Sequence, residues 1–336
     1  MSKISIVIPV YKVGQYIENS MKSICNQTFK DIDVLLVDNN TPDNSIEIAE
    51  NVLKKSNIDY RVVRQTIQGL PAARNMGIRE AKGEWIISID PDDTVSPRFL
   101  SDLYECATNN NLNIVFSKYA EVGADTLFDF REENKEAVTE FYNKEEVLKL
   151  LLVRKLPLMI SNMFFKKDAF IQKGCWFDED VILGADLINL WRILLNTERI
   201  AYINKVLYNH FERPDSLMTA PGWKKIDSNI MGYKRLREYV KANYSEQMSK
   251  WIYGRAVYAF LATICIYGGK EMYKEYLNKY YDNEVHQILQ SFPDNKIQKL
   301  DSLLFSLPSI FYFVNRTLRN PNTFIWKSLD KLLHHK

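Results

Sequence analysis

Short runs rich in Val and Ile alternate with segments of helical periodicity through residues 1–120. The runs show little polar alternation, which is typical of strands in a sheet that is covered on both faces. The segments between them space their apolar residues as a helix does, for example at Ile17, Met21 and Ile24. The predicted strands are Ile4–Val10, Asp33–Val37, Tyr60–Val63, Trp85–Ile89 and Asn113–Phe116. Repeated strand–helix–strand units predict an α/β fold with a doubly wound, mostly parallel sheet of the Rossmann-like kind.

Polar residues follow several of these strands, at the edge where open parallel sheets bind their ligands. Tyr11 can stack on a flat base, or it can be an ordinary aromatic residue at the rim. Asp38 and Asn39 offer hydrogen-bonding groups to a pyrimidine or a ribose, although Asn39 also begins a typical turn composition. We expect one crevice to receive the polar residues at the strand ends, which are Pro9, Tyr11, Asp38, Asn39, Asp90, Asp92 and Asp93.

Three carboxylates, Asp90, Asp92 and Asp93, directly follow the strand that ends at Ile89. Carboxylates tolerate burial only when they are paired or ligated, and oxygen ligands on one short loop suit Mg²⁺ or Mn²⁺. Mg²⁺ keeps few protein carboxylates and completes its shell with phosphate oxygens and water. The segment therefore predicts a metal and diphosphate site, against the alternative of a solvated turn around Pro91.

A flexible glycine, Gly69, precedes a predicted helix that starts near Pro71 and carries Arg74 one turn inside. A helix N-terminus with an arginine nearby favours an anionic or nucleotide ligand. The sequence has no glycine-rich phosphate loop of the G-x-x-x-x-G-K or G-x-G-x-x-G kind. We therefore expect phosphate to be held mainly by metal.

Composition narrows the class of protein further. The formal net charge is +2, which gives nucleic-acid binding no electrostatic support. The four cysteines are scattered singly and predict core thiols rather than a disulfide framework or a metal site. The first residues lack the pattern of a signal peptide, and the longest apolar run, residues 256–267, is too short to cross a bilayer. These features predict a cytoplasmic protein.

Five short blocks follow one another in the sequence, and they are Ile6–Tyr11, Ser23–Phe29, Leu36–Asn39, Gly69–Asn75 and Asp90–Asp93. In order and spacing these blocks resemble those of bacterial glycosyltransferases of family 2, which have the GT-A fold. The resemblance is strong over residues 1–120, continues loosely to Leu217 and fades beyond residue 220. It implies a metal-dependent, inverting transfer of a sugar from a UDP-sugar or another nucleotide-sugar. The acceptor would be a glycan or lipid-linked oligosaccharide in capsule, exopolysaccharide or lipopolysaccharide synthesis.

The resemblance also implies roles for single residues. Asp90 and Asp92 would form the D-x-D motif, with Asp90 near the ribose and Asp92 ligating Mn²⁺ or Mg²⁺. Asp93 would lie with the donor and could point toward the acceptor hydroxyl. His210 would contact the metal or the diphosphate, against the alternative of an ordinary structural histidine. The residues that would bind the nucleotide part of the donor are Pro9, Tyr11, Asp38, Asn39, Gly69 and Arg74.

By the same resemblance Asp186 would be the general base, against the alternative of a helix-capping aspartate. Two departures from the family pattern are Ala185, in place of the usual Glu, and Asn39, where many relatives have Asp. They leave open a catalytically inactive nucleotide-sugar or glycan-binding protein. A second alternative is a haloacid-dehalogenase-like phosphatase, because Ile89–Thr94 fits its motif with Asp90 as the nucleophile.

We expect residues 1–220 to form the catalytic domain, with 1–120 binding the nucleotide-sugar and 121–220 binding the acceptor. Residues 221–336 are expected to be α-helical, with helices at Lys224–Ala242, Gln247–Tyr267 and Lys270–Tyr281. The apolar run Leu303–Phe313 and the basic residues after it suit the surface of an anionic membrane. This predicts peripheral contact with the cytoplasmic face of the inner membrane, against packing on the catalytic domain or on a second copy in a homodimer.

Overall fold

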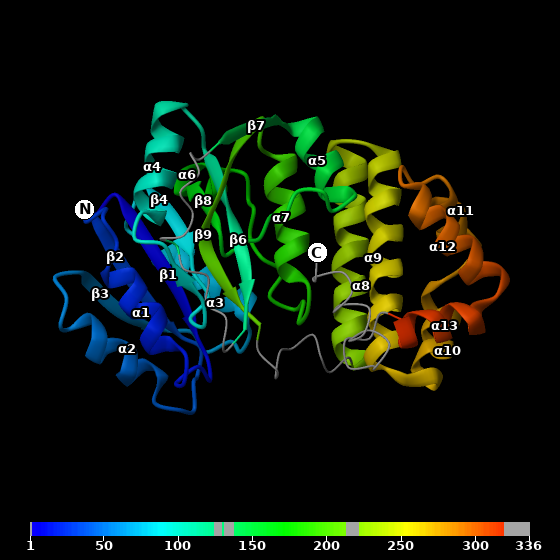
Figure 1. Cartoon of the computed structure of the whole chain (residues 1–336), viewed down its shortest axis with the longest axis horizontal. Coiled ribbons are helices and arrows are strands. Elements are labelled where there is room, and N and C mark those ends of the chain that lie inside the picture. The colour runs from blue at the N-terminus through cyan, green and yellow to red at the C-terminus, as the bar shows by residue number, and fades with distance from the viewer. Residues whose placement is uncertain (1, 124–129, 131–137, 213–221, 319–336) are drawn as a thin grey trace, which may run out of the picture. The chain divides into compact units, whose positions relative to one another are not determined.

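The computed structural model describes residues 2–123, 130, 138–212 and 222–318. Contacts between residues divide the chain into two compact units, Met1–Pro214 and Asp215–Lys336. Among the described residues, the first unit contains a single nine-stranded sheet with helices, whereas the second contains helices without strands (Figure 1).

The N-terminal half of the sheet is parallel and follows the order β3-β2-β1-β4. The chain steps outward from β1 to β3 and then returns to the other side of β1 with β4. The strand order therefore reverses between β1 and β4, which is the point where open α/β sheets bind ligands. All four strands were predicted from the sequence, and the structure places them at Ile4–Val10 (β1), Ile32–Asp38 (β2), Asp59–Arg64 (β3) and Trp85–Ser88 (β4).

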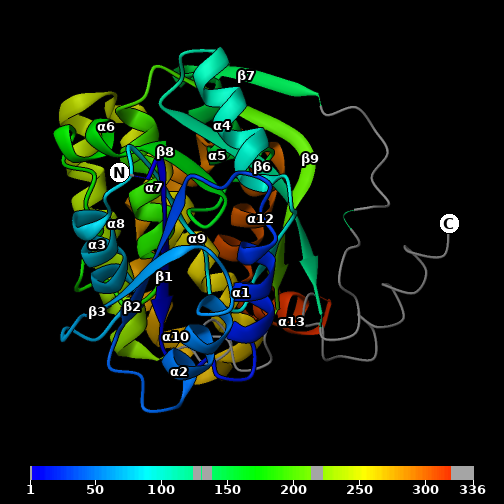
Figure 2. The same cartoon turned by 90° about the vertical axis from the view of Figure 1, so that its left-hand side faces the viewer.

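Helices cover both faces of this parallel half, so the predicted doubly wound arrangement is confirmed. Ile6 and Ile8 of β1 join a core cluster with apolar residues of α1, α2 and α4. Val7 points to the opposite face, where it contacts Gly77 of α3. Figure 2 shows α1 and α3 on opposite sides of β1. The helices are Ile17–Cys25 (α1), Ser45–Leu53 (α2), Leu70–Glu80 (α3) and Phe99–Asn109 (α4).

The other half of the sheet is mixed. Strand β8 is antiparallel to both of its neighbours, β4 and β6, and β6 is parallel to β9. Two short strands, β5 and β7, pair with β9 in the antiparallel sense. The elements are Thr94–Val95 (β5), Ile114–Val122 (β6), Thr139–Asn143 (β7), Lys144–Leu152 (α5), Met163–Lys166 (β8), Lys167–Gln172 (α6), Ala185–Leu195 (α7) and Arg199–Phe211 (β9).

The second unit is built on α9, which packs against α8, α10, α11 and α13. The Ser245 hydroxyl caps α9 by accepting a hydrogen bond from the Met248 amide. The three helices predicted here are confirmed to within one residue at each end. No described helix is long and apolar enough to cross a membrane. The helices are Trp223–Asn243 (α8), Glu246–Tyr267 (α9), Gly269–Tyr280 (α10), Asn283–Gln290 (α11), Asn295–Ser306 (α12) and Pro308–Leu318 (α13).

The contact between α3 and β1 requires glycine at position 77. A Cβ atom there would lie 2.2 Å from Cγ1 of Val7. We expect Gly77→Ala to lower the free energy of unfolding by about 1 kcal/mol or more, because overpacking outweighs the gain in helix propensity. Urea denaturation measures the change. The double variant with Val7→Ala should lose less stability than the sum of the single variants, and simple additivity would contradict the proposed contact.

Candidate active site

The ends of β1, β2 and β4 bring the predicted polar residues to one edge of the sheet. Val10 pairs with Asp38 in the parallel register, and the Asn39 amide donates to the Val10 carbonyl at 3.1 Å. The Ile89 amide donates to the Val7 carbonyl at 3.0 Å, so Asp90 emerges at the same edge. Tyr11 is 41% exposed there, as a ring that stacks on a base would have to be.

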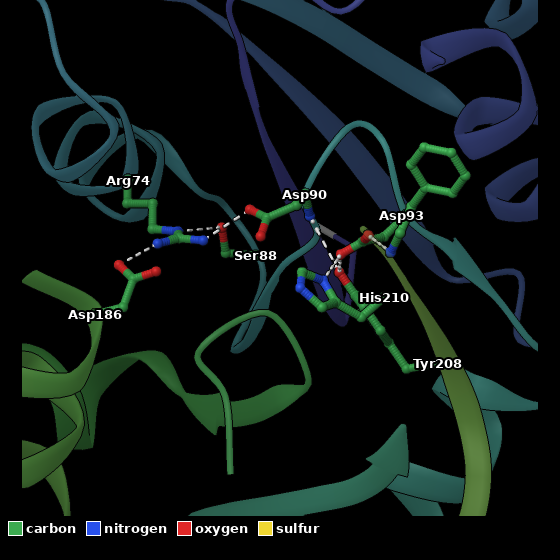
Figure 3. A network of polar contacts seen from close by, with 8 residues as sticks. Arg74, Ser88, Asp90, Asp93, Asp186, Tyr208 and His210 are labelled. Atoms are coloured by element: carbon green, nitrogen blue, oxygen red, sulfur yellow. Dashed lines mark hydrogen bonds and ion pairs between the residues drawn. The ribbon is translucent and has the colours of Figure 1, made fainter. Parts of the chain in front are cut away.

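Arg74 lies at the centre of the site and is fully buried. Its Nη2 donates to Oδ1 of Asp90 at 2.7 Å, and its Nη1 donates to Oδ1 of Asp186 (Figure 3). Its Nε contacts the Ser88 hydroxyl at 3.4 Å. Burial disfavours the charged guanidinium, but attraction to Asp186 and Asp90 outweighs burial and raises the pKa of Arg74 above its usual value. A permanent cation therefore joins two carboxylates that are far apart in the sequence.

A glycine precedes each of the two helices that carry Arg74 and Asp186. Gly69, with φ at +142°, turns the chain into α3, and Arg74 follows one turn later. Gly184, with φ at +78°, is the N-cap of α7. Asp186 therefore lies in the first turn of α7 rather than at its cap, and its side chain is 43% exposed. The Asp186 carboxylate is therefore partly exposed, and Arg74 fixes its orientation.

Asn75, next to Arg74 in the sequence, holds the loop that leads to α7. Its Nδ2 donates to the Phe177 carbonyl at 3.0 Å and to Glu179 at 2.8 Å. Its Oδ1 accepts from the Phe177 amide at 3.0 Å. Sequence reasoning did not assign Asn75 a role, and the only signal was its place in the Gly69–Asn75 block. Arg74 and Asn75 together fix the approach of α7 to α3.

Asp93 is placed differently from Asp90, although both belong to the same short segment. Its side chain is fully buried, with Oδ2 accepting from the Tyr208 hydroxyl at 2.5 Å and Oδ1 from the Phe211 amide at 2.7 Å. These bonds tie the segment to β9 (Figure 3). The structure thus gives Asp93 a structural role, and its predicted contact with donor or acceptor stays a prediction. The part of Tyr208 in this arrangement was not predicted.

His210 lies beside the carboxylates and is 37% exposed. Its Nδ1 lies 3.4 Å from Oδ2 of Asp93. This hydrogen bond, together with the negative charges of Asp93, Asp90 and Asp92, outweighs the effect of burial and raises the pKa of His210 to about 9. A protonated Nδ1 can donate to that carboxylate. The predicted contact of His210 with the metal or the diphosphate stays a prediction.

The carboxylates fit a divalent cation that binds together with the donor. Asp90 is 22% exposed and Asp92 is partly buried. Within the described part of the chain, no group of three or more His, Cys, Asp or Glu side chains is placed to hold a metal. Asp90 and Asp92 therefore offer a partial set of hard oxygen ligands, as Mg²⁺ uses when substrate phosphates complete its shell.

Asn39 has both ends of its amide engaged by the loop before α3. Its Nδ2 donates to the Ile67 carbonyl at 2.7 Å and to the Gln65 carbonyl at 3.2 Å. Its Oδ1 accepts from the Gly69 amide at 2.8 Å. Asp38 likewise accepts locally, from the Thr41 amide at 2.9 Å. Asn39 therefore positions Gly69, and direct contact of Asn39 with a base stays a prediction.

Comparison with known proteins agrees with this architecture. Residues 5–172 match the family Glycosyl transferase family 2. The Uncharacterized glycosyltransferase EpsJ of Bacillus subtilis is 31% identical over 68% of this chain and 66% of that protein. The structure of S. aureus TarS 1-349 in complex with UDP-GlcNAc superposes with a TM-score of 0.68 at 16% identity, covering 96% of this chain and 93% of that one.

A second solved structure is more distant. Mannosyltransferase PcManGT from Pyrobaculum calidifontis, in complex with GDP-Man and Mn²⁺, has a TM-score of 0.52 at 15% identity and covers 94% of this chain and 87% of that one. Both structural likenesses concern the fold, which is of the GT-A kind. The chain belongs to glycosyl transferase family 2.

The buried hydrogen bond between Tyr208 and Asp93 should be important for stability. Tyr208→Phe removes the hydroxyl that donates to Asp93 and accepts from the Asp90 amide. We expect the free energy of unfolding to fall by about 1–3 kcal/mol, because buried polar groups lose their partner. Urea denaturation measures this. Tyr11→Phe, the same change on an exposed ring, is the control and should have an effect within about 0.5 kcal/mol. Equal effects of the two variants would contradict a stabilising role of the hydrogen bond between Tyr208 and Asp93.

Proposed function

We propose that this family 2 glycosyl transferase transfers a sugar, with inversion, from a UDP-sugar to a hydroxyl group of a glycan or lipid-linked oligosaccharide in bacterial surface polysaccharide synthesis. The observation that supports this best is the bridge from Asp90 through Arg74 to Asp186. Asp90 follows β4 at the edge where a nucleotide would bind, and Asp186 starts α7. The guanidinium of Arg74 thus links Asp90, which lies where the donor would bind, with Asp186, which would face the acceptor.

Asp186 acts as the general base in this proposal. The acceptor oxygen forms a bond to the anomeric carbon while the bond from that carbon to the diphosphate oxygen breaks. The proton of the acceptor hydroxyl passes to Asp186, whose side chain is 43% exposed. Arg74 holds the carboxylate in one orientation, which lowers the entropic cost of reaching the reactive geometry.

Asp90 and Asp92 would hold Mn²⁺ or Mg²⁺ together with the donor diphosphate. When bound, such an ion stabilises the negative charge that develops on the leaving nucleoside diphosphate. The Mn²⁺ in the PcManGT complex supports this assignment. His210, which lies beside these carboxylates, would contact the same metal or diphosphate.

The nucleoside would lie over the ends of β1 and β2. Tyr11 is exposed and would stack on the base, while Pro9 and Asp38 would line the pocket and Asn39 would hold Gly69 in place. The UDP-GlcNAc in the TarS complex supports a uridine donor. Residues 121–220 would bind the acceptor, and a lipid-linked acceptor would require the enzyme to work at the cytoplasmic face of the inner membrane.

The role of Asp186 is tested by Asp186→Asn, which keeps the shape of the side chain and its hydrogen bond from Arg74. We expect the turnover number to fall by about 10²- to 10⁴-fold, because the amide does not accept the proton. Donor binding should persist, since Asp186 belongs to the acceptor side. Nucleotide release with a UDP-sugar and a purified glycan acceptor measures turnover, and isothermal titration with UDP and Mn²⁺ measures binding.

Glu179→Gln is the matched control for Asp186→Asn. Glu179 is a partly exposed carboxylate on the loop that leads to α7, and its amide counterpart can still accept from Asn75. The control should keep turnover near that of the unmodified enzyme. Full turnover by Asp186→Asn would remove this residue from the mechanism, and equal losses in both variants would indicate a general charge effect.

Donor choice and metal use are tested by thermal unfolding with UDP-, GDP- and CMP-sugars, each with and without Mn²⁺. A UDP-sugar at about 100 times its Kd should stabilise the protein by about 2.7 kcal/mol, and mainly when Mn²⁺ is present. Asp92→Asn should lose the metal-dependent part of this shift. The control is Glu105→Gln, which changes an exposed carboxylate on α4. A response only to GDP- or CMP-sugars would contradict the uridine assignment.

A further inference from the structure

The corner between α12 and α13 exposes a concentration of large apolar side chains. Of the fourteen exposed residues of this kind within the described part of the chain, four lie at residues 305–313. Single exposed apolar residues are ordinary, whereas grouped ones mark interaction sites. We call these four residues the α12–α13 patch, which consists of Phe305 (51% exposed), Leu307 (50%), Ile310 (48%) and Phe313 (66%).

Helix α13 is firmly packed on one face, so the exposure of the other face does not come from an undocked helix. Phe311 is fully buried, and its ring lies 6.0 Å from that of Tyr258 on α9. The Tyr273 hydroxyl donates to the Pro308 carbonyl at 2.7 Å, which fixes the start of the helix. Ile310 and Phe313 are three residues apart, which places them on a shared face.

The α12 side of the patch rests on a buried polar network. Asp301 is fully buried and accepts from Tyr281, from Nδ1 of His286 at 2.7 Å and from Nε2 of Gln290 at 2.6 Å. The ring of His286 stacks on Phe305 with centroids 3.8 Å apart and an interplanar angle of 13°. Phe305 is therefore held in place while half of its surface stays exposed.

The sequence from Pro308 onward is rich in basic residues. Residues 308–336 contain five Lys or Arg and one Asp, a net charge of +4, whereas the whole chain is only +2. The other residues therefore sum to −2. Arg316 is exposed on α13, three residues after Phe313. Apolar side chains flanked by basic ones match a membrane surface that carries anionic lipids. The residues counted are Arg316, Arg319, Lys327, Asp330, Lys331 and Lys336.

We propose that the α12–α13 patch docks on the surface of an anionic bilayer, with its four apolar side chains among the acyl chains and Arg316 at the headgroups. The contact is peripheral, because no described helix can span a membrane. This docking rests on the proposed function in one respect: it would bring the enzyme to the membrane that holds a lipid-linked acceptor. Docking needs no nucleotide, so it can be tested separately from sugar transfer.

The test is co-sedimentation of the full chain with vesicles in the absence of nucleotide. We expect binding to vesicles of equal parts phosphatidylglycerol and phosphatidylcholine but not to phosphatidylcholine alone, and weaker binding at about 0.5 M NaCl because salt screens the basic residues. The double variant Ile310→Asp/Phe313→Asp should bind at least about tenfold less. Phe313→Ser should give a smaller loss of the same sign.

Met231→Asp is the matched control, because Met231 is also exposed (55%) but lies on α8. It should bind vesicles like the unmodified protein. All variants should keep the thermal shift with UDP and Mn²⁺ of the unmodified protein, which separates failure of docking from failure of the proposed function. Equal vesicle binding by the double variant and the unmodified protein would overturn the proposal. So would a dimer that forms without vesicles and that the double variant abolishes, as measured by light scattering.

Discussion

The site depends on one buried cation. Arg74 is fully enclosed, so its charge is tolerable only with carboxylates in hydrogen-bonding contact. Asp90 and Asp186 meet that need, and they come from the end of β4 and the start of α7. Losing either carboxylate would leave the buried guanidinium short of a partner and lower the free energy of unfolding. Folding therefore favours the arrangement in which Asp90 and Asp186 lie on either side of the guanidinium.

The three aspartates after β4 lie in different surroundings. Asp90 neutralises Arg74, whereas Asp93 is buried and bonded to Tyr208 and Phe211 of β9. Because Asp93 fixes one end of the segment and Arg74 the other, Asp92 between them is held at the sheet edge. His210 lies beside the segment, with Nδ1 3.4 Å from Oδ2 of Asp93. The run of carboxylates is thus held from two sides, by Arg74 and by β9.

The sequence predicts the parallel half of the sheet well, because strand and helix periodicity are local properties of the chain. The five predicted strands and the three predicted helices of the second unit are present. Strands β5, β7 and β8 were not predicted, since each pairs in the antiparallel sense with a strand that is distant in the sequence. In the candidate active site, too, contacts between residues that are distant in the sequence were not predicted. Residue types placed Asp90 and Tyr11 at one edge, but the contact between Arg74 and Asp186 spans 112 residues. The proposed role of Asp186 followed from a family resemblance alone, and the hydrogen bonds of the Asn39 side chain were not predicted.

The helical unit leaves apolar side chains exposed on α13, whereas the first strand of the sheet is buried. In the sheet, β1 is buried along its whole length. In α13, Phe311 and Asn315 face inward while Ile310 and Phe313 remain exposed. A helix that is apolar on opposite sides is expected to be buried on both. The hydrogen bonds of Asp301 hold His286 in place, and the His286 ring stacks on Phe305 beside this face. Ordering the side chain of Phe305, which stays half exposed, costs conformational entropy. Such an arrangement is favourable when a second apolar phase covers the exposed side, and the excess of basic residues after Leu307 makes an anionic lipid surface the phase that fits best.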